Sequence, residues 1–139
     1  MTGTIDQFAI DYVEGTLLEL DKPARVAGHE ELRGFDMDGV ICTLGPPYDK
    51  CKPLLIPGGR FVIISARPEK AREVTERWLA ENGICPEGLY LRPSFVSPTG
   101  HKIEWCNRLE VTYFYESDLD ITRALVKAGI QAFHVRRMK

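Results

Sequence analysis

The clearest indication of the fold is the stretch Leu32-Arg33-Gly34-Phe35-Asp36-Met37-Asp38-Gly39-Val40. Its first part is an apolar run that ends at Phe35, and the carboxylates Asp36 and Asp38 follow directly. Carboxylates two residues apart at a strand end repel each other unless a cation intervenes, and hard oxygen ligands favour Mg2+ over zinc. The stretch therefore predicts a central strand that delivers two acids to a cation-dependent site.

The rest of the chain alternates apolar runs with helical patterns, separated by Gly and Pro. Residues 4–17 show helical spacing and predict an amphipathic helix ahead of the central strand. After the central strand, further strands are predicted at 60–64, 89–91, 111–115 and 130–135, and helices from Pro68 to a stop at Gly83, at 100–107 and at 119–127. Strands that alternate with helices predict an α/β fold, a parallel sheet covered on both faces.

Length and composition limit the remaining possibilities. The chain has 139 residues and a formal net charge of −2, which predicts one domain over residues 1–139. No apolar run is long enough to span a membrane, and we expect a cytoplasmic protein whose four cysteines are reduced thiols. The slight excess of acidic residues gives no overall field that would attract nucleic acid, although a local basic patch is sufficient for binding.

Ligands of such a sheet bind beyond the carboxyl ends of the strands, so the polar residues there carry the functional prediction. We expect at this edge Asp36, Asp38 and Gly39 after the first central strand, Ser65 and Arg67 after the second, Arg92 after the third, Lys102 on the next helix, and Glu116 and Asp118 after the fourth. Together they offer a carboxylate nucleophile beside a metal, a hydroxyl for a phosphoryl oxygen, and a lysine that offsets charge during transfer.

These residues resemble the four motifs of the haloacid dehalogenase (HAD) superfamily. Phe35-Asp36-Met37-Asp38-Gly39-Val40 looks like the first motif, Ile63-Ile64-Ser65 the second, Lys102 the third, and Tyr115-Glu116-Ser117-Asp118 the acidic fourth. The resemblance implies a Rossmann-like three-layer α/β/α sandwich with strand order 3-2-1-4-5 and Mg2+-dependent phosphoryl transfer.

Carried over residue by residue, the resemblance makes Asp36 the nucleophile that becomes aspartyl phosphate. It makes Asp38 the acid and base, and it makes Asp36 and the Asp38 backbone carbonyl metal ligands. Ser65 would hold a phosphoryl oxygen, and Lys102 would steady the phosphoryl group and the nucleophile. The fourth motif departs from the usual Gly-Asp or Asp-Asp pair, so either Glu116 or Asp118 completes the metal site, with Glu116 slightly favoured.

Substrate choice in this superfamily depends on cap insertions, and both insertion points, 40–59 and 92–101, are too short for a cap domain. The site would be covered by a stiff flap, by a second subunit acting as a lid, or by the substrate itself, with Gly39, Arg67 and Arg92 as candidate substrate contacts. The chain also loosely resembles the 3′-phosphatase domain of phage polynucleotide kinases. The predicted substrate is a small metabolite phosphate or a nucleotide or polynucleotide 3′-phosphate. The alternative is a phosphate-binding scaffold that keeps the fold and has lost turnover.

Overall fold

A parallel sheet of six strands forms the centre of the molecule. The computed structural model describes the backbone at residues 3–4, 16–20, 24–26 and 31–137, and side chains at residues 31–135. In spatial order the strands are β2 (Thr16–Leu20), β9 (Ala132–Arg137), β8 (Tyr113–Glu116), β4 (Arg33–Phe35), β6 (Phe61–Pro68) and β7 (Leu89–Arg92). Every neighbouring pair runs parallel, so the strands all end at the same edge.

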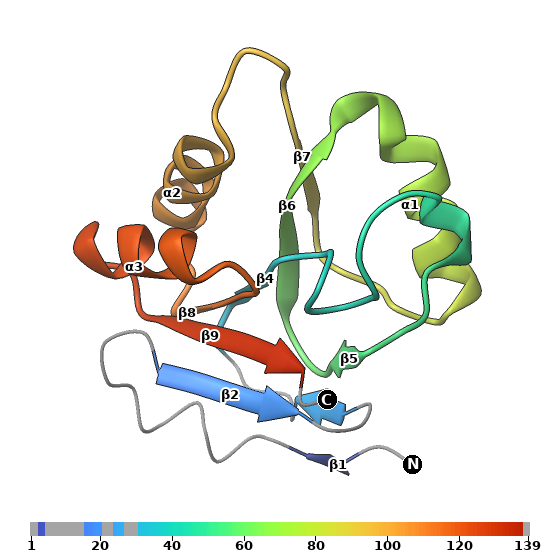
Figure 1. Ribbon diagram of the computed structural model, residues 1–139, viewed down its shortest axis with the longest axis horizontal. Helices are drawn as coiled ribbons and strands as arrows, with labels where there is room; N and C mark the ends of the chain where they lie inside the picture. Colours follow the sequence, from blue (N-terminus) through green and yellow to red (C-terminus); the bar gives the residue numbers. More distant parts are fainter. Residues whose placement is uncertain (1–2, 5–15, 21–23, 27–30, 138–139) are drawn as a thin grey trace.

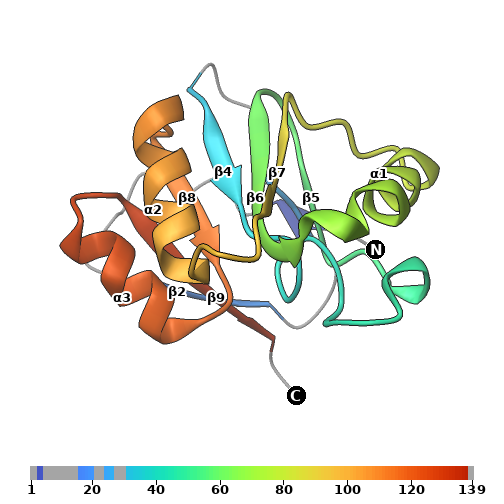
Figure 2. The ribbon, with the colours of Figure 1, turned by 90° about the horizontal axis from the view of Figure 1, so that it is seen from above.

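Helices cover both faces of this sheet, as Figures 1 and 2 show. Helix α1 (Arg72–Glu81) lies on one face, and α2 (Pro98–Leu109) and α3 (Leu119–Lys127) lie together on the other. A smaller parallel sheet joins β1 (Gly3–Thr4), β3 (Ala24–Val26) and β5 (Leu55–Pro57). The predicted α/β fold with three layers is confirmed.

The predicted strand order is also confirmed, with one addition. The expected order 3-2-1-4-5 corresponds to β7-β6-β4-β8-β9, and β2 extends the sheet by pairing with β9. The helix predicted over 4–17 is wrong at both ends, because Thr4 lies in β1 and Leu17 lies in β2; residues 5–15 lie outside the described part. A short apolar run does not distinguish strand from helix, and here the free edge of β9 supplies the pairing that makes it a strand.

The start of α1 differs from the prediction by one turn. Pro68 is the last residue of β6 rather than part of the helix. A short 3-10 helix, Glu69–Ala71, follows it, and α1 begins only at Arg72. Gly83 has a φ of +67°, a left-handed conformation that glycine adopts without strain, and it ends the helical segment as expected.

Two apolar layers hold β4 in place. Phe35 is fully buried and stacks on Tyr115, with ring centroids 4.6 Å apart, while Phe61 meets it edge-on at 5.8 Å. On the other face, Ile64 and Phe114 pack against α2 and α3. The end of β4 is therefore fixed from both sides, which gives the residues that follow it a rigid base.

The two candidate insertion points remain small. Between β4 and β6 the chain forms a loop with one short 3-10 helix, Tyr48–Lys50, followed by β5. Between β7 and α2 lies only the loop 93–97. Both segments are fully described, and neither forms a domain of its own. No helix in the described part of the chain is long and apolar enough to cross a membrane.

Candidate active site at the carboxyl edge of the sheet

Asp36 is the first residue after β4, and its carboxylate is held at both oxygens. Its side chain is 7% exposed. Oδ1 accepts hydrogen bonds from the Lys102 ammonium at 3.1 Å and from the Met37 backbone N–H at 2.9 Å. Oδ2 accepts one from the Ser117 hydroxyl at 2.9 Å. The Asp36 N–H also donates to the Tyr115 carbonyl of β8, so backbone and side chain are both anchored.

Lys102 lies on the inner side of α2 and connects Asp36 to Glu116. Its Nζ is 2.6 Å from Glu116 Oε1, and its side chain is 2% exposed. Lys102 is therefore a buried residue and not an ordinary exposed lysine on the surface of a helix. Burial lowers the pKa of the Lys102 ammonium, but the carboxylates of Asp36 and Glu116 outweigh burial and raise it above the usual value.

Glu116 is the last residue of β8, and both of its carboxylate oxygens accept hydrogen bonds. Its Oε1 faces Lys102, and its Oε2 accepts the backbone N–H groups of Ser117 and Asp118, both at 3.0 Å. Burial, reinforced by the charge of Asp36, raises the pKa of Glu116. Burial is the larger cause, and the Lys102 ammonium, which Glu116 shares with Asp36, only partly opposes it.

Asp38 is paired with a different cation, Arg67. The guanidinium donates from Nε to Asp38 Oδ2 at 2.9 Å and from one terminal nitrogen to Oδ1 at 2.7 Å. The other terminal nitrogen donates to Thr75 of α1, and the guanidinium carbon lies 4.0 Å from the ring centre of Tyr48. Arg67 is thus 2% exposed and bonded to Asp38 rather than standing open on the rim. Such a bidentate pair fixes the orientation of the carboxylate.

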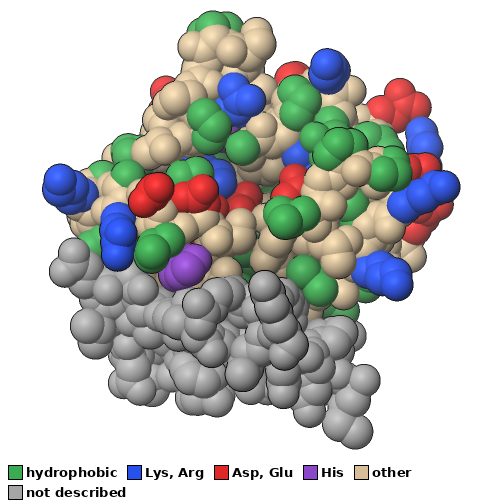
Figure 3. Space-filling model, in the orientation of Figure 1, with side chains coloured by type: hydrophobic (Ala, Val, Ile, Leu, Met, Phe, Trp, Pro, Cys, Tyr) green, Lys and Arg blue, Asp and Glu red, His purple; other side chains and the backbone are tan. Residues whose placement is uncertain are grey.

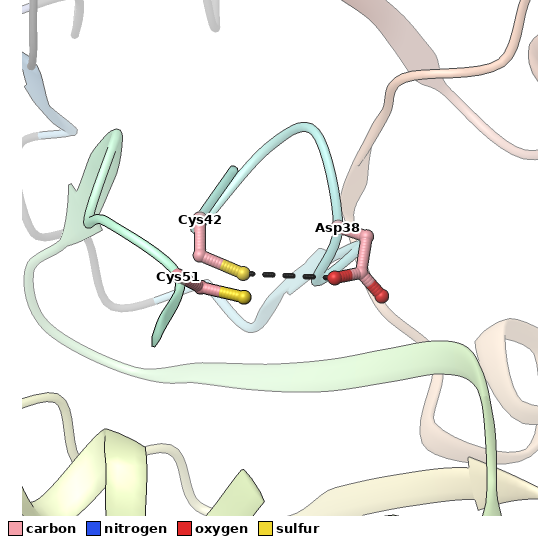
Figure 4. Close-up of side chains that lie close together, drawn as sticks. All are labelled: Asp38, Cys42 and Cys51. Atoms are coloured by element: carbon pink, nitrogen blue, oxygen red, sulfur yellow. Dashed lines mark hydrogen bonds between the residues drawn. The ribbon is translucent and has the colours of Figure 1, made fainter. Parts of the chain in front are cut away.

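The thiols of Cys42 and Cys51 lie beside Asp38, and the three side chains point toward one another (Figure 4). A carboxylate and two sulfurs at this separation suggest a soft-metal site. However, one terminal nitrogen of Arg67 lies 3.4 Å from the Cys42 sulfur and 3.6 Å from the Cys51 sulfur, besides its bond to Asp38. Burial raises the pKa of Cys42, so its thiol stays neutral. The guanidinium therefore already supplies the positive charge that a metal would bring.

Three further predicted residues lie at this edge with clear local contacts. Ser65, at the carboxyl part of β6, is 1% exposed, and its oxygen accepts the Arg67 backbone N–H at 3.0 Å. Arg92 donates to the backbone carbonyls of Ala66 and Val96, so it connects the carboxyl part of β6 to the loop after β7. Gly39 has a φ of +86°, and a side chain there would come within 2.8 Å of the Ser117 Cβ.

Ser117 is the residue that sequence reasoning missed. Its hydroxyl oxygen lies 2.9 Å from Asp36 Oδ2 and 3.0 Å from the Asp38 backbone carbonyl. In the sequence, the only indication of a role is its position between two acidic residues at a strand end, where a serine is typical of a spacer. Asp118 caps α3 by accepting the Ile121 N–H. The Ser117 hydroxyl oxygen thus lies within hydrogen-bond distance of two other oxygens, Asp36 Oδ2 and the Asp38 carbonyl, and hard oxygen donors of this kind suit Mg2+.

A groove opens beside these oxygens. Its volume is about 570 Å3, and its described lining is mainly apolar. It is lined by Gly39, Thr43, Leu44, Leu54, Ser117, Asp118, His134 and Val135. The space-filling view shows acidic and basic side chains around a hollow near the middle of the face (Figure 3). A ligand that reached Asp36 and Ser117 would have room for an apolar moiety next to them.

Comparison with known proteins supports the fold and leaves the family open. No protein-family model and no curated protein matches the chain. Among solved structures, a Pnkp1/Rnl/Hen1 RNA repair complex contains a chain with a TM-score of 0.62 and 18% identity, matching 78% of this chain and 43% of that one. A Pnkp1/Rnl/Hen1 complex gives 0.62 and 16%, over 79% of this chain and 47% of that one. The chain therefore spans less than half of the chains that it resembles.

The buried cluster predicts a large stability effect at Lys102. Lys102→Met leaves Asp36 and Glu116 without their shared cation and should lower the free energy of unfolding at pH 7 by about 3–5 kcal/mol. Lys127→Met, at an exposed position of α3, is the matched control and should change it by less than about 0.5 kcal/mol. Urea denaturation measures both. Adding Glu116→Gln to Lys102→Met should recover part of the loss, and equal losses for the two single variants would contradict the buried cluster.

Proposed function

We propose that this chain is a divalent-cation-dependent phosphatase of the HAD type that uses Asp36 as its nucleophile. The observation that carries the proposal is the state of the Asp36 carboxylate, held at one oxygen by Lys102 and at the other by Ser117. A nucleophile fixed in this way loses little orientational freedom on attack. Asp38, two residues further on and oriented by Arg67, provides a separate group for proton transfer.

The proposed reaction has two steps, phosphoryl transfer to Asp36 and hydrolysis of the aspartyl phosphate. An Asp36 oxygen attacks the phosphorus, the bond to the leaving oxygen breaks, and Asp38, protonated at the start of this step, gives that oxygen its proton. Asp38 then takes a proton from water, the water oxygen attacks the phosphorus, and the Asp36–phosphate bond breaks to release inorganic phosphate. Lys102 offsets the negative charge, and the Ser65 hydroxyl, whose oxygen accepts a backbone N–H, retains its hydrogen for a phosphoryl oxygen.

The residues present fit a Mg2+ ion. Asp36 Oδ2 and the Asp38 carbonyl are the donors that the HAD resemblance implies, and they already share one partner, Ser117. Both oxygens of Glu116 are taken by Lys102 and by backbone N–H groups, which favours Asp118, on the wall of the groove, as the second carboxylate. When bound, the cation supplies charge neutralisation for the transferring phosphoryl group.

A phosphate at the end of a polynucleotide is the substrate class that we favour. The two described insertion points carry no cap that would limit the size of the substrate. The groove beside Asp36 and Ser117 has an apolar lining suited to a nucleoside. The structural neighbours come from an RNA repair complex, which points to the same class. A small metabolite phosphate remains the second candidate.

Two substitutions test the proposed chemistry. Asp36→Asn and Asp38→Asn should each reduce Mg2+-dependent phosphate release by several orders of magnitude, because one removes the nucleophile and the other the proton donor. Phosphate release from a panel of phosphomonoesters measures the effect, and circular dichroism shows whether the fold persists. Near wild-type turnover by either folded variant would refute the assignment.

The substrate class is tested by direct competition. We expect kcat/KM for an oligoribonucleotide with a 3′-phosphate to exceed that for glucose 6-phosphate by at least about tenfold and to fall with rising salt, as phosphate contacts do. The same oligonucleotide with a 5′-phosphate is the control for which end is used. A preference for glucose 6-phosphate would assign a metabolite phosphatase. Absence of turnover on every substrate would assign the non-catalytic scaffold instead.

A further inference from the structure

The Ser117 side chain lies where two candidate cation ligands meet. Its oxygen is 2.9 Å from Asp36 Oδ2 and 3.0 Å from the Asp38 carbonyl. A hydroxyl has one hydrogen, so it can satisfy only one of these acceptors at a time. The second acceptor is then left facing the lone pairs of the Ser117 oxygen. A cation among the three oxygens would relieve that conflict, because each of them could then act as a ligand.

The surrounding contacts show that this position is built rather than accidental. The Ser117 N–H donates to Glu116, and the His134 ring nitrogen lies 3.2 Å from the Ser117 carbonyl. Gly39 lacks a side chain where one would come within 2.9 Å of the Ser117 hydroxyl oxygen. The backbone of Ser117 is thus fixed by β8 and β9, and the loop after β4 approaches it closely only because residue 39 is glycine.

The charge of the site follows from the identity of this residue. Asp36 brings one negative charge to the three oxygens, whereas the Asp38 carbonyl and the Ser117 hydroxyl are neutral. Lys102, bonded to the same carboxylate, reduces even that charge. Affinity for a hard divalent cation rises with the number of charged ligands. Of the candidate ligands, only Asp36 and the exposed Asp118 carry a negative charge, and Lys102 partly neutralises Asp36, so the site should bind the cation weakly when no other anion is present.

We propose that Ser117 is a ligand of the divalent cation, and that its neutral hydroxyl makes cation binding depend on the substrate's phosphate. This inference rests on the proposed phosphatase function. The phosphate adds oxygen ligands and negative charge at the same point, so cation and phosphate each strengthen the binding of the other. The chain would then hold its cation mainly when a substrate or product phosphate is bound.

Binding of Mn2+, counted by the electron paramagnetic resonance of the free ion, tests this without requiring turnover. The full chain is titrated with Mn2+ in the absence and in the presence of inorganic phosphate. For the wild type we expect phosphate to lower the Mn2+ dissociation constant by at least about tenfold. Ser117→Ala should weaken Mn2+ binding by about tenfold in the presence of phosphate. Ser117→Asp should strengthen it by about tenfold without phosphate and remove most of the phosphate dependence.

Matched variants separate a ligand role from a general effect. Ser94→Ala and Ser94→Asp make the same chemical changes at an exposed serine of the loop 93–97 and should leave Mn2+ binding unchanged. Thermal unfolding confirms that each variant is folded, and Ser117→Ala, the smaller change, keeps the test decisive if Ser117→Asp does not fold. Mn2+ affinity unchanged in folded Ser117→Ala overturns the inference. If substrates show no turnover while Mn2+ binding follows the expected pattern, the phosphatase proposal fails and the ligand role of Ser117 stands.

Discussion

The Lys102 ammonium lies between two buried carboxylates, and the geometry of the candidate site depends on that placement. Its bonds to Asp36 and Glu116 connect the ends of two neighbouring strands, β4 and β8, with helix α2 on one face of the sheet. Without the ammonium, two carboxylates would face each other in a space that excludes water, at a large electrostatic cost. The Lys102 ammonium therefore holds Asp36, the candidate nucleophile, close to Glu116 of the fourth motif.

A second, separate cation gives Asp38 a different environment. Arg67 orients this carboxylate from β6, with Thr75 and the Tyr48 ring holding the guanidinium in turn. Two acids that are two residues apart in the chain thus have different partners, one lysine and one arginine. Different surroundings allow two carboxylates to take different chemical roles. The division of labour proposed for Asp36 and Asp38 follows from this arrangement.

The sequence predicted the parts of the fold that depend on long-range burial. The run Phe61–Ile64 is apolar throughout because both faces of β6 are covered, and its three β-branched residues favour a strand over a buried helix. The sequence could not predict β2, because its pairing with β9 is a tertiary contact and Leu17 fits a helical pattern equally well. Tertiary pairing overrode the local signal there.

The candidate site shows the same division. The strand ends predicted that Asp36, Asp38, Ser65 and Glu116 lie at one edge of the sheet, because parallel strands end together. Ser65 and Glu116 lie within β6 and β8 rather than after them. The sequence did not show that Lys102 is buried or that Arg67 bonds Asp38, since both depend on how a helix and a loop fold back over that edge. Ser117 was not predicted because a serine between two acids is typical of an exposed turn. Its role depends on two distances that exist only in the folded chain.

Reductive trapping of a covalent phosphoryl intermediate on Asp36 is the sharpest test of the proposed mechanism. The chain is incubated with Mg2+ and a 3′-phosphorylated oligoribonucleotide, quenched with sodium borohydride and analysed by peptide mass spectrometry. An acyl phosphate is reduced to an alcohol, so the aspartyl-phosphate mechanism predicts that homoserine replaces aspartate at position 36 only when substrate is present. Phosphate release with an unmodified Asp36 peptide, or with the modification on another carboxylate, would contradict it.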